Sequence, residues 1–334
     1  MGKYSDSPEW ADVTPLPTNE GGPNPLAAIA YSDEYAETMS YLRACMAADE
    51  HSPRVLDLTE DLIDMNPAHY TVWLYRAKVL ISVHEKKGDL LGGLRGELEW
   101  LNEIALSHQK NYQIWHHRNL LVNKIAEVGN GKGEEVDISA EREFVEKMFG
   151  LDAKNYHVWS YRQWLVKRFG LWREDEYGEL EFTERMLRKD VRNNSAWNHR
   201  WYVINGNGGG VEGDEDVRDR EITFAKKAIE KAPQNCSPWN YLRGVVRKSG
   251  VGLGSLKGFA EQYADWEKVE GVRSSHALDL LADILGEEEG GDGKARAGKA
   301  LDLLATRYDP IRKNYWEYRK GLLGLAPTVA AGAA

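Results

Sequence analysis

The sequence predicts an all-α fold, a right-handed superhelical solenoid of antiparallel helix pairs. A segment in which Trp precedes Arg by three or four residues recurs along the chain. Its tryptophans stand 42, 44, 38 and 42 residues apart, at Trp73, Trp115, Trp159, Trp197 and Trp239. A further copy at Trp316 lies 77 residues on, which leaves room for one degenerate unit around residues 275–285. Repetition at this period is typical of helical repeat proteins, and no stretch alternates apolar and polar residues as a strand would.

The first 30 residues are predicted to form an extended, proline-rich arm. Pro15, Pro17 and Pro25 stand too close together for a helix, because proline lacks an N–H donor and clashes with the preceding turn. Trp10 is the one residue expected to anchor this arm. The repeat domain is predicted over residues 31–325, and the Ala-rich tail over residues 326–334 is predicted to be disordered.

Each repeat is predicted to be a pair of helices. Apolar residues recur at helical spacing in the first helix, as in residues 53–63, 141–149 and 181–187. A polar turn follows, and the second helix carries the Trp and the Arg. Neither helix buries its apolar stripe alone, so neighbouring pairs must stack. Runs rich in Gly and acidic residues at 128–137, 206–216 and 286–293 are predicted to be solvated, mobile loops.

Composition and charge exclude several classes of protein. The formal charge of −10 and the pI near 5.5 argue against a nucleic-acid-binding face, which would need to be basic. Cys45 and Cys236 are the only cysteines, so neither a disulfide framework nor a cysteine zinc site is expected. No apolar run approaches the roughly 20 residues that span a bilayer, and no secretory signal precedes the first helix. A cytoplasmic protein without a membrane span and without bound metal is expected.

The repeated Trp and Arg are interpreted as packing residues. Trp and Arg separated by three positions lie on one face of a helix, and six copies are too many for one active site. We expect the Trp to fill the space between stacked pairs and the Arg to pair with carboxylates of the first helices. His116, His117 and His199 are likewise expected to be polar packing residues, because no metal-binding spacing accompanies them.

The turn before each second helix combines two kinds of residue. Asn recurs there and is expected to cap the following helix, at Asn111, Asn155, Asn193 and Asn235. A basic residue precedes three of these caps, although a cation is mildly unfavourable at a helix N-terminus. Lys110, Lys154 and Arg192 would then form a basic ridge beside Tyr112, Tyr156 and His157. An anion-binding ridge and ordinary solvated charge both fit this pattern, and the spacing does not select Lys154.

Several segments together resemble the α subunit shared by protein farnesyltransferase and type I protein geranylgeranyltransferase. In family order over residues 9–320, they include Glu9-Trp10-Ala11-Asp12, Gly22-Pro23-Asn24-Pro25, Asn111-Tyr112-Gln113, Asp152-Ala153-Lys154-Asn155-Tyr156-His157, Asp190-Val191-Arg192-Asn193-Asn194-Ser195 and Trp239-Asn240-Tyr241-Leu242. The Gly-acid insertions and the short Ala-rich C-terminus depart from the animal members and suggest a fungal-type one. The resemblance implies a crescent of helical hairpins wrapped around an α–α barrel β subunit.

The same resemblance implies a division of labour between two subunits. The β subunit would hold the catalytic zinc and the isoprenoid pocket, and magnesium is a further candidate cofactor for farnesyl transfer. The acceptor would be the cysteine of a C-terminal Cys-a-a-X box on a substrate protein. Lys154 matches the family's catalytic lysine, which faces the prenyl diphosphate. Tyr156, His157, Tyr112 and Asn193 match neighbouring positions that line the cleft and bind substrate.

Two other functions are weighed against this one. A non-catalytic peptide-binding scaffold of the tetratricopeptide kind would have a 34-residue period, whereas the spacings here run from 38 to 44. The α subunit of the Rab-directed geranylgeranyltransferase is the second alternative, and it lacks the proline-rich N-terminal match. Whether farnesyl or geranylgeranyl transfer dominates is not decided by this sequence, because the lipid pocket lies in the partner.

Overall fold

The computed structural model describes residues 2–19, 21–22, 24–131, 138–172, 178–268, 270–288 and 291–326. Within these ranges the regular structure is helical, apart from one isolated antiparallel bridge between Ala264 and Val272. The chain divides into two compact units, Met1–Trp164 and Leu165–Ala334. The predicted all-α fold of repeated helix pairs is confirmed.

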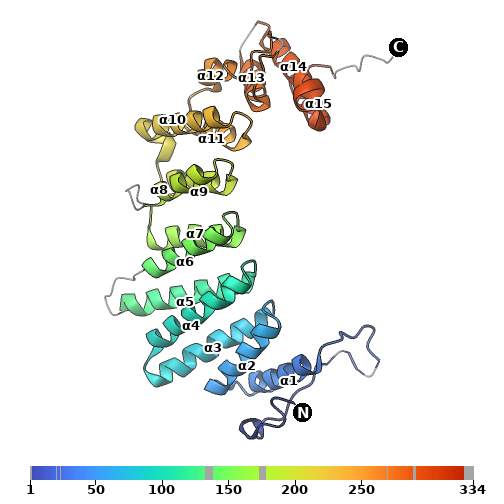
Figure 1. Cartoon of the computed structure of the whole chain (residues 1–334), viewed down its shortest axis with the longest axis vertical. Helices are drawn as coiled ribbons and strands as arrows, with labels where there is room; N and C mark the ends of the chain where they lie inside the picture. Colours follow the sequence, from blue (N-terminus) through green and yellow to red (C-terminus); the bar gives the residue numbers. More distant parts are fainter. Residues whose placement is uncertain are drawn as a thin grey trace. The chain divides into compact units, whose positions relative to one another are not determined.

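The helices of the first unit follow one another as antiparallel pairs that stack in chain order (Figure 1). Helices α2 and α3 pack together, as do α4 and α5. The helices that begin in the described part of this unit are α1 (Asp33–Ala47), α2 (Pro53–Met65), α3 (Tyr70–Lys87), α4 (Leu90–Ser107), α5 (Tyr112–Gly131), α6 (Ser139–Leu151) and α7 (Tyr156–Phe169). A single 3₁₀ turn, η1 (Pro8–Trp10), precedes them. The first helix expected at 141–149 is α6.

The second unit continues the helix pairs with α8 packed on α9 and α10 packed on α11. Its α-helices in the described ranges are α8 (Glu179–Lys189), α9 (Asn194–Asn205), α10 (Glu215–Lys231), α11 (Cys236–Lys248), α12 (Lys257–Glu261), α13 (Ser275–Glu287), α14 (Gly293–Leu303) and α15 (Lys313–Leu322). Shorter helical segments are η2 (Gly210–Glu212), η3 (Leu253–Leu256), η4 (Leu304–Tyr308, a π-turn) and η5 (Pro310–Arg312). The helix expected at 181–187 is α8.

The N-terminal arm is attached to α1 and α2 by more than Trp10. Trp10 is 5% exposed, as expected, and its ring packs edge-on against Tyr4 and Tyr41. Tyr4 is 3% exposed and was not identified as an anchor from the sequence. Arg54 of α2 binds both carboxylate oxygens of Asp12 at 2.8 and 3.0 Å and lies over the Trp10 ring. Residues 4–12 of the arm are therefore folded against α1 and α2, and the arm is not extended throughout.

The run at 206–216 is largely exposed, as expected, and the other two runs lie partly in helices and partly outside the described ranges. In the run at 206–216, Val211 is 2% exposed, because the 3₁₀ turn η2 directs this apolar side chain inward. Gly208, Gly209 and Gly210 have positive φ, a conformation in which other residues are strained, so they make that turn possible. Helix α5 continues into the run at 128–137, and α13 into the run at 286–293. Residues 132–137, 289–290 and the tail from 327 lie outside the described ranges.

The degenerate unit expected around residues 275–285 is present, and α13 is its second helix. Ser274 caps α13 by accepting a hydrogen bond from the Ala277 N–H, and its hydroxyl donates to the Pro233 carbonyl at 2.6 Å. Leu278 stands four residues after this cap, where the preceding repeat places Trp239 four residues after Asn235. Leu278 is fully buried. A smaller apolar residue has replaced the tryptophan without loss of the helix pair.

Candidate functional site

The turns before the second helices are fixed by asparagine side chains, as predicted. Asn155 Oδ1 accepts the His157 N–H at 2.9 Å, which caps α7. The Asn155 amide donates to the Gln109 carbonyl in the preceding turn at 3.0 Å. Asn111 repeats this arrangement, with its amide on the Pro67 carbonyl at 2.8 Å. Each asparagine therefore caps its own helix and fastens its turn to the turn before it.

The repeated tryptophans also form hydrogen bonds with these turns. Their indole N–H donates to the carbonyl six residues earlier, at 2.8 to 3.2 Å, in Trp73, Trp115, Trp159, Trp197 and Trp239. The Gln109 carbonyl thus accepts both the Trp115 indole N–H and the Asn155 amide. The predicted packing role of the tryptophans is confirmed, and it includes a hydrogen bond that the spacing does not reveal.

Three of the repeated arginines form buried ion pairs with the first helix of the next pair. Arg118 of α5 binds both carboxylate oxygens of Glu141 on α6, at 2.8 and 2.7 Å, and the two side chains are 2% and 8% exposed. The same two-point contact joins Arg76 of α3 to Glu97 of α4, and Arg200 of α9 to Glu221 of α10. A buried charge is costly unless it is paired. The arginines are therefore structural, as the sequence predicted.

A third side chain completes each of these carboxylate sites. Two residues after the repeat tryptophan, His117 contacts Glu97 at 2.8 Å and the Tyr161 hydroxyl donates to Glu141 at 2.5 Å. Burial by itself would raise the pKa of Glu97, but the His117 hydrogen bond and the Arg76 charge outweigh it and lower the pKa to about 2. Burial and the Glu141 charge raise the pKa of Tyr161 well above its usual value. His199 contacts Glu179 at 2.7 Å, so His117 and His199 are polar packing residues as expected.

The residues predicted to act chemically lie at the exposed edge of these turns. In the first unit, the Tyr112 and His157 rings meet edge to face with centroids 4.3 Å apart, and the Tyr156 and His157 ring centroids are 5.6 Å apart. Both tyrosines are 67% exposed. Lys154 is exposed in the same turn. Four of the five predicted site residues are therefore gathered at two consecutive turns.

His157 is electrically neutral at pH 7 in this arrangement. Burial has the largest effect and lowers the pKa of His157 below the usual 6.5. A backbone hydrogen bond to Lys110 raises this pKa in part, and the positive charge of Lys110 lowers it again. The cations at this edge are therefore lysines. A neutral imidazole at this edge is available as a hydrogen-bond donor or acceptor.

Asn193 belongs to the second unit and has a structural task. It is 1% exposed, and its side-chain oxygen accepts the Ser195 and Ala196 N–H groups at 3.0 and 3.3 Å at the start of α9. Its predicted contact with substrate stays a prediction, as does the extension of the basic ridge to Arg192. Within the first unit, the basic ridge consists of Lys110 and Lys154.

Asp152 is a further residue of these turns, and the sequence pattern of Asn and basic residues does not include it. Its Oδ1 accepts the Lys154 N–H at 2.9 Å, and its Oδ2 lies 3.4 Å from Lys110 Nζ. One carboxylate thus shapes the Lys154 turn and holds the lysine of the preceding turn. The signal was present in the sequence, because Asp190 makes the same bond to the Arg192 N–H at 2.9 Å. Asp two residues before a basic residue recurs at both turns.

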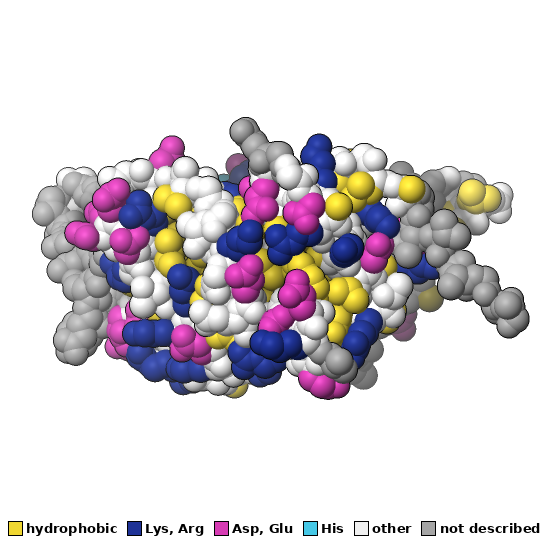
Figure 2. All heavy atoms as spheres, turned by 90° about the horizontal axis from the view of Figure 1, so that it is seen from above, with side chains coloured by type: hydrophobic (Ala, Val, Ile, Leu, Met, Phe, Trp, Pro, Cys, Tyr) yellow, Lys and Arg dark blue, Asp and Glu magenta, His cyan; other side chains and the backbone are white. Residues whose placement is uncertain are grey.

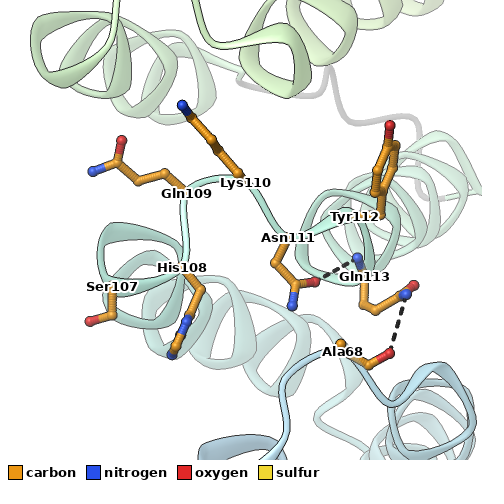
Figure 3. A pocket seen from close by; sticks show the side chains of 8 residues that line it. All are labelled: Ala68, Ser107, His108, Gln109, Lys110, Asn111, Tyr112 and Gln113. Carbon is orange, nitrogen blue, oxygen red and sulfur yellow. Dashed lines mark hydrogen bonds between the residues drawn. The ribbon is translucent and has the colours of Figure 1, made fainter.

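A surface hollow of about 560 Å³ lies beside the Lys110 turn and is lined by Ala68 and residues 107–113. Figure 3 shows the side chains of Gln109 and Lys110 extending from the turn on one side, while Asn111 is directed back toward the Ala68 segment. The Gln113 amide donates to the Ala68 carbonyl at 3.4 Å. The turn backbone is thus held from below, and the Lys110 ammonium is left on the outer edge.

On the face shown in Figure 2, basic and acidic side chains are interspersed around small apolar areas, without one broad basic region. No helix within the described ranges is long and apolar enough to cross a membrane. No cluster of three or more His, Cys, Asp or Glu that could hold a metal ion is found among the described residues.

Comparison with known proteins gives a family match along the array. The family described as "Protein prenyltransferase alpha subunit repeat" matches residues 52–82, 94–125, 138–169, 177–206 and 218–249. A Candida albicans protein, "Protein farnesyltransferase/geranylgeranyltransferase type-1 subunit alpha", is 37% identical over 314 residues, covering 93% of this chain and 96% of the relative. A solved structure, Candida albicans protein geranylgeranyltransferase-I complexed with GGPP, matches 93% of this chain and 97% of its own with a TM-score of 0.83 and 36% identity.

A relative of the second type matches a much smaller part. The pig "Geranylgeranyl transferase type-2 subunit alpha" is 32% identical over 82 residues, which are 24% of this chain and 14% of that protein. The match to the type-1 subunit is therefore both longer and closer. Each matched repeat contains one of the Trp positions from which the array was predicted.

Proposed function

Because the chain belongs to the family of α subunits shared by protein farnesyltransferase and type-1 protein geranylgeranyltransferase, we propose that it is the α half of a heterodimeric protein prenyltransferase. The heterodimer transfers farnesyl, or geranylgeranyl with another β subunit, from the prenyl diphosphate to the cysteine of a C-terminal Cys-a-a-X box. The observation that carries this proposal is the match to the Candida albicans α subunit along almost the whole chain.

Lys154 is proposed as the catalytic residue of this chain. Asp152 and Asn155 fix the backbone around it, while its side chain stays exposed. As the bond between C1 of the prenyl group and the diphosphate oxygen breaks, negative charge grows on the diphosphate. An ammonium group directed at that charge stabilises the transition state more than the ground state. Lys154 would in this way speed the departure of the diphosphate.

Tyr112, Tyr156 and His157 are proposed to bind the diphosphate beside Lys154. The tyrosines are exposed at the edge, so their hydroxyls are free to donate hydrogen bonds to phosphate oxygens. His157 has a lowered pKa and would donate one N–H as a neutral ring. Asn193 is assigned to the same substrate-binding group on the family resemblance.

The zinc of this reaction is proposed to be bound by the β subunit, where it would convert the substrate cysteine to its thiolate. Magnesium is proposed as a counter-ion of the diphosphate in farnesyl transfer. This chain's own contribution is to bind and orient the diphosphate and to support the β subunit. Cys45 and Cys236 are both free thiols, which supports a reducing, cytoplasmic location.

Co-expression with each candidate β subunit tests this function. We expect purified heterodimer to transfer farnesyl or geranylgeranyl to a Cys-a-a-X peptide, with neither subunit active alone and with no transfer to a peptide in which Ser replaces the Cys. Absence of transfer with every type-1 partner and both diphosphates would overturn the proposal. Copurification with a type-2 β subunit, together with a requirement for an escort protein, would instead support the Rab-directed enzyme. A monomer that binds peptides without transfer would support the scaffold.

The choice of Lys154 among its basic neighbours is tested by two matched substitutions. Lys154→Ala should lower the transfer rate by about 100- to 1,000-fold, the loss typical of one charge-stabilising group. Lys110→Ala removes the lysine at the corresponding position one repeat earlier and should cost less than about fivefold. Equal losses in the two variants would contradict the assignment of Lys154.

A further inference from the structure

A basic hollow lies in the second unit, at the turn that precedes Asn193. This hollow of about 390 Å³ is lined by the end of α8, the turn after it and the last turns of α10. Its basic lining residues are Arg188, Lys189, Arg192, Lys227 and Lys231, and its acidic ones are Glu184 and Asp190. Five positive and two negative charges leave a net charge of +3 in a chain whose net charge is −10. The hollow is therefore strongly basic for this protein.

The two acidic residues of this hollow already have partners. Glu184 lies 3.3 Å from Arg200 and 3.7 Å from Arg188. Asp190 accepts the Arg192 N–H at 2.9 Å. Within the described ranges, no ion pair joins a carboxylate to the side chains of the remaining cations, Lys189, Arg192, Lys227 and Lys231. Their charges are left for a ligand or for solvent.

Helix dipoles account for two of these four cations. Lys189 and Lys231 are the last residues of α8 and α10, where a cation is favourable against the dipole. Arg192 lies in the turn beyond α8, and Lys227 lies one turn before the end of α10. Lys227 and Lys231 are four residues apart on α10 and so share one face. The dipole therefore does not account for the pairing of Arg192 and Lys227 at this hollow.

The repeats provide an internal reference for the same positions. When the repeats are aligned on their tryptophans, Trp197 and Trp239 correspond to Trp115 and Trp159, two repeats earlier. The residues at the four basic positions are then Ser107 for Lys189, Lys110 for Arg192, Lys147 for Lys227 and Leu151 for Lys231. Only two of these are basic, and Lys110 lies 3.4 Å from Asp152 Oδ2. The earlier repeat folds without the other cations. The four basic residues at the later position are thus not a requirement of the helix pair.

The floor of the hollow is apolar. Leu187, Trp197 and Ala228 line it and are 6%, 2% and 7% exposed. Several cations around one phosphate dianion bind it strongly, because each of them attracts it at short range. An apolar floor beneath them favours a ligand that has a hydrocarbon part next to its charged group.

We propose that this hollow binds a phosphate-bearing amphiphile, in which phosphate monoester or diphosphate oxygens contact Lys189, Arg192, Lys227 and Lys231 and a hydrocarbon part lies over Leu187 and Trp197. Two sources have this chemistry, a free isoprenoid diphosphate and a phosphorylated lipid headgroup in a membrane. The site uses none of the residues of the Lys154 turn, and it shares with the proposed reaction only the turn that precedes Asn193. The proposal rests on the basic residues and the apolar floor of the hollow, and it does not depend on which prenyl group the heterodimer transfers.

The test uses the purified heterodimer and the double substitution Lys227→Glu, Lys231→Glu. Both side chains are exposed, so folding should be preserved, which the melting temperature checks. Farnesyl diphosphate is titrated by calorimetry, and flotation is measured with phosphatidylcholine vesicles containing either a phosphoinositide bisphosphate or phosphatidylserine at equal charge. Lys147→Glu, at the corresponding earlier position, is the matched control.

We expect at least a tenfold loss of affinity for one of these two phosphate probes in the double variant and less than a twofold change in Lys147→Glu, with transfer activity retained in both. Loss on farnesyl diphosphate assigns the site to a free diphosphate, as a binding component beyond the catalytic one. Loss on phosphoinositide vesicles alone assigns it to a headgroup. Affinities within twofold of wild type for both phosphate probes, or equal loss on phosphatidylserine, would overturn the proposal. Retained transfer separates this outcome from a failure of the proposed function.

Discussion

Two regions of the same turns differ in how strictly they repeat. In the buried region the same contacts recur. An indole N–H and an asparagine amide share the Pro67, Gln109 and Val191 carbonyls, and an arginine pairs with a buried glutamate in three repeats. The exposed region changes at each turn. The position five residues before the tryptophan is Lys110, Lys154, Arg192 and then Gln234 in successive repeats.

The difference separates the residues that make the array from those that act on a ligand. A contact between neighbouring repeats must be made in every repeat, because each pair buries its apolar face only against the next. A side chain at the outer edge is free to change, so a repeat that differs there has been adapted to a partner or a ligand. Lys154 and the four cations of the second unit both lie in the region that varies.

The largest effect is expected when an ion pair of the buried region is removed. Arg118→Ala leaves Glu141 as a buried, unpaired carboxylate and should reduce the free energy of unfolding by about 3 to 5 kcal/mol. Urea unfolding followed by circular dichroism measures it. Lys124→Ala on the same helix, which removes a charge outside these pairs, should change the free energy by less than about 0.5 kcal/mol. Similar losses in the two variants would show that the buried pair is not what holds the repeats together.

The buried carboxylates also predict how stability depends on pH. The pKa of Glu97 is about 2 in the folded chain and 4.5 ordinarily. A lowered pKa stabilises the fold fully above about pH 4.5, and this contribution is lost as the pH falls toward 2. The loss should be about 3 kcal/mol for this group.

Unfolding at pH 5 and at pH 2.5 tests this term with two substitutions. In Glu97→Gln the decrease in unfolding free energy between the two pH values should be smaller than in wild type. In Glu99→Gln, which changes an exposed carboxyl on the same helix, it should match wild type. An unchanged pH dependence in Glu97→Gln would mean that this carboxylate does not titrate with a lowered pKa.

The smallest expected effect lies at the exposed edge. The pKa of His157 should fall below 6.5, because the ring is partly buried and Lys110 is near it. Tyr112→Ala removes the ring that packs edge-on against His157 and should move this pKa upward. Titration of the imidazole C–H signals by NMR measures both values. A His157 pKa above 6.5 in the wild-type chain would contradict the neutral ring proposed at the site.

The array could be predicted from the sequence because its signals are local. A large aromatic residue, an asparagine cap and helical spacing recur within each repeat, and even the unit that lacks tryptophan was located from the remaining gap. The partner of each arginine could not be predicted, because Glu141 lies 23 residues from Arg118 and the pairing depends on how neighbouring helices stack. Burial of Tyr4 and Val211 was missed for the same reason.

Only part of the candidate site could be predicted from the sequence. Spacing located the edge of the turns, but a solvated lysine and a lysine that meets a ligand look alike in a local pattern. The family resemblance, and not the period, selected Lys154 from Lys110 and Arg192. Asp two residues before the basic residue is visible in the sequence, but the contact of Asp152 with Lys110 is not, because it joins two repeats.

The most direct test of the central claim compares two adjacent residues of one turn in the heterodimer, Lys154→Ala and Asn155→Ala. Lys154→Ala should lower the transfer rate by about 100- to 1,000-fold while the free energy of unfolding changes by less than about 0.5 kcal/mol. Asn155→Ala removes a helix cap and the bond to Gln109, and it should reduce the free energy of unfolding by about 1 to 3 kcal/mol. A transfer rate for Lys154→Ala within twofold of wild type, or a loss of stability as large as that of Asn155→Ala, would contradict the separation of chemistry from repeat architecture.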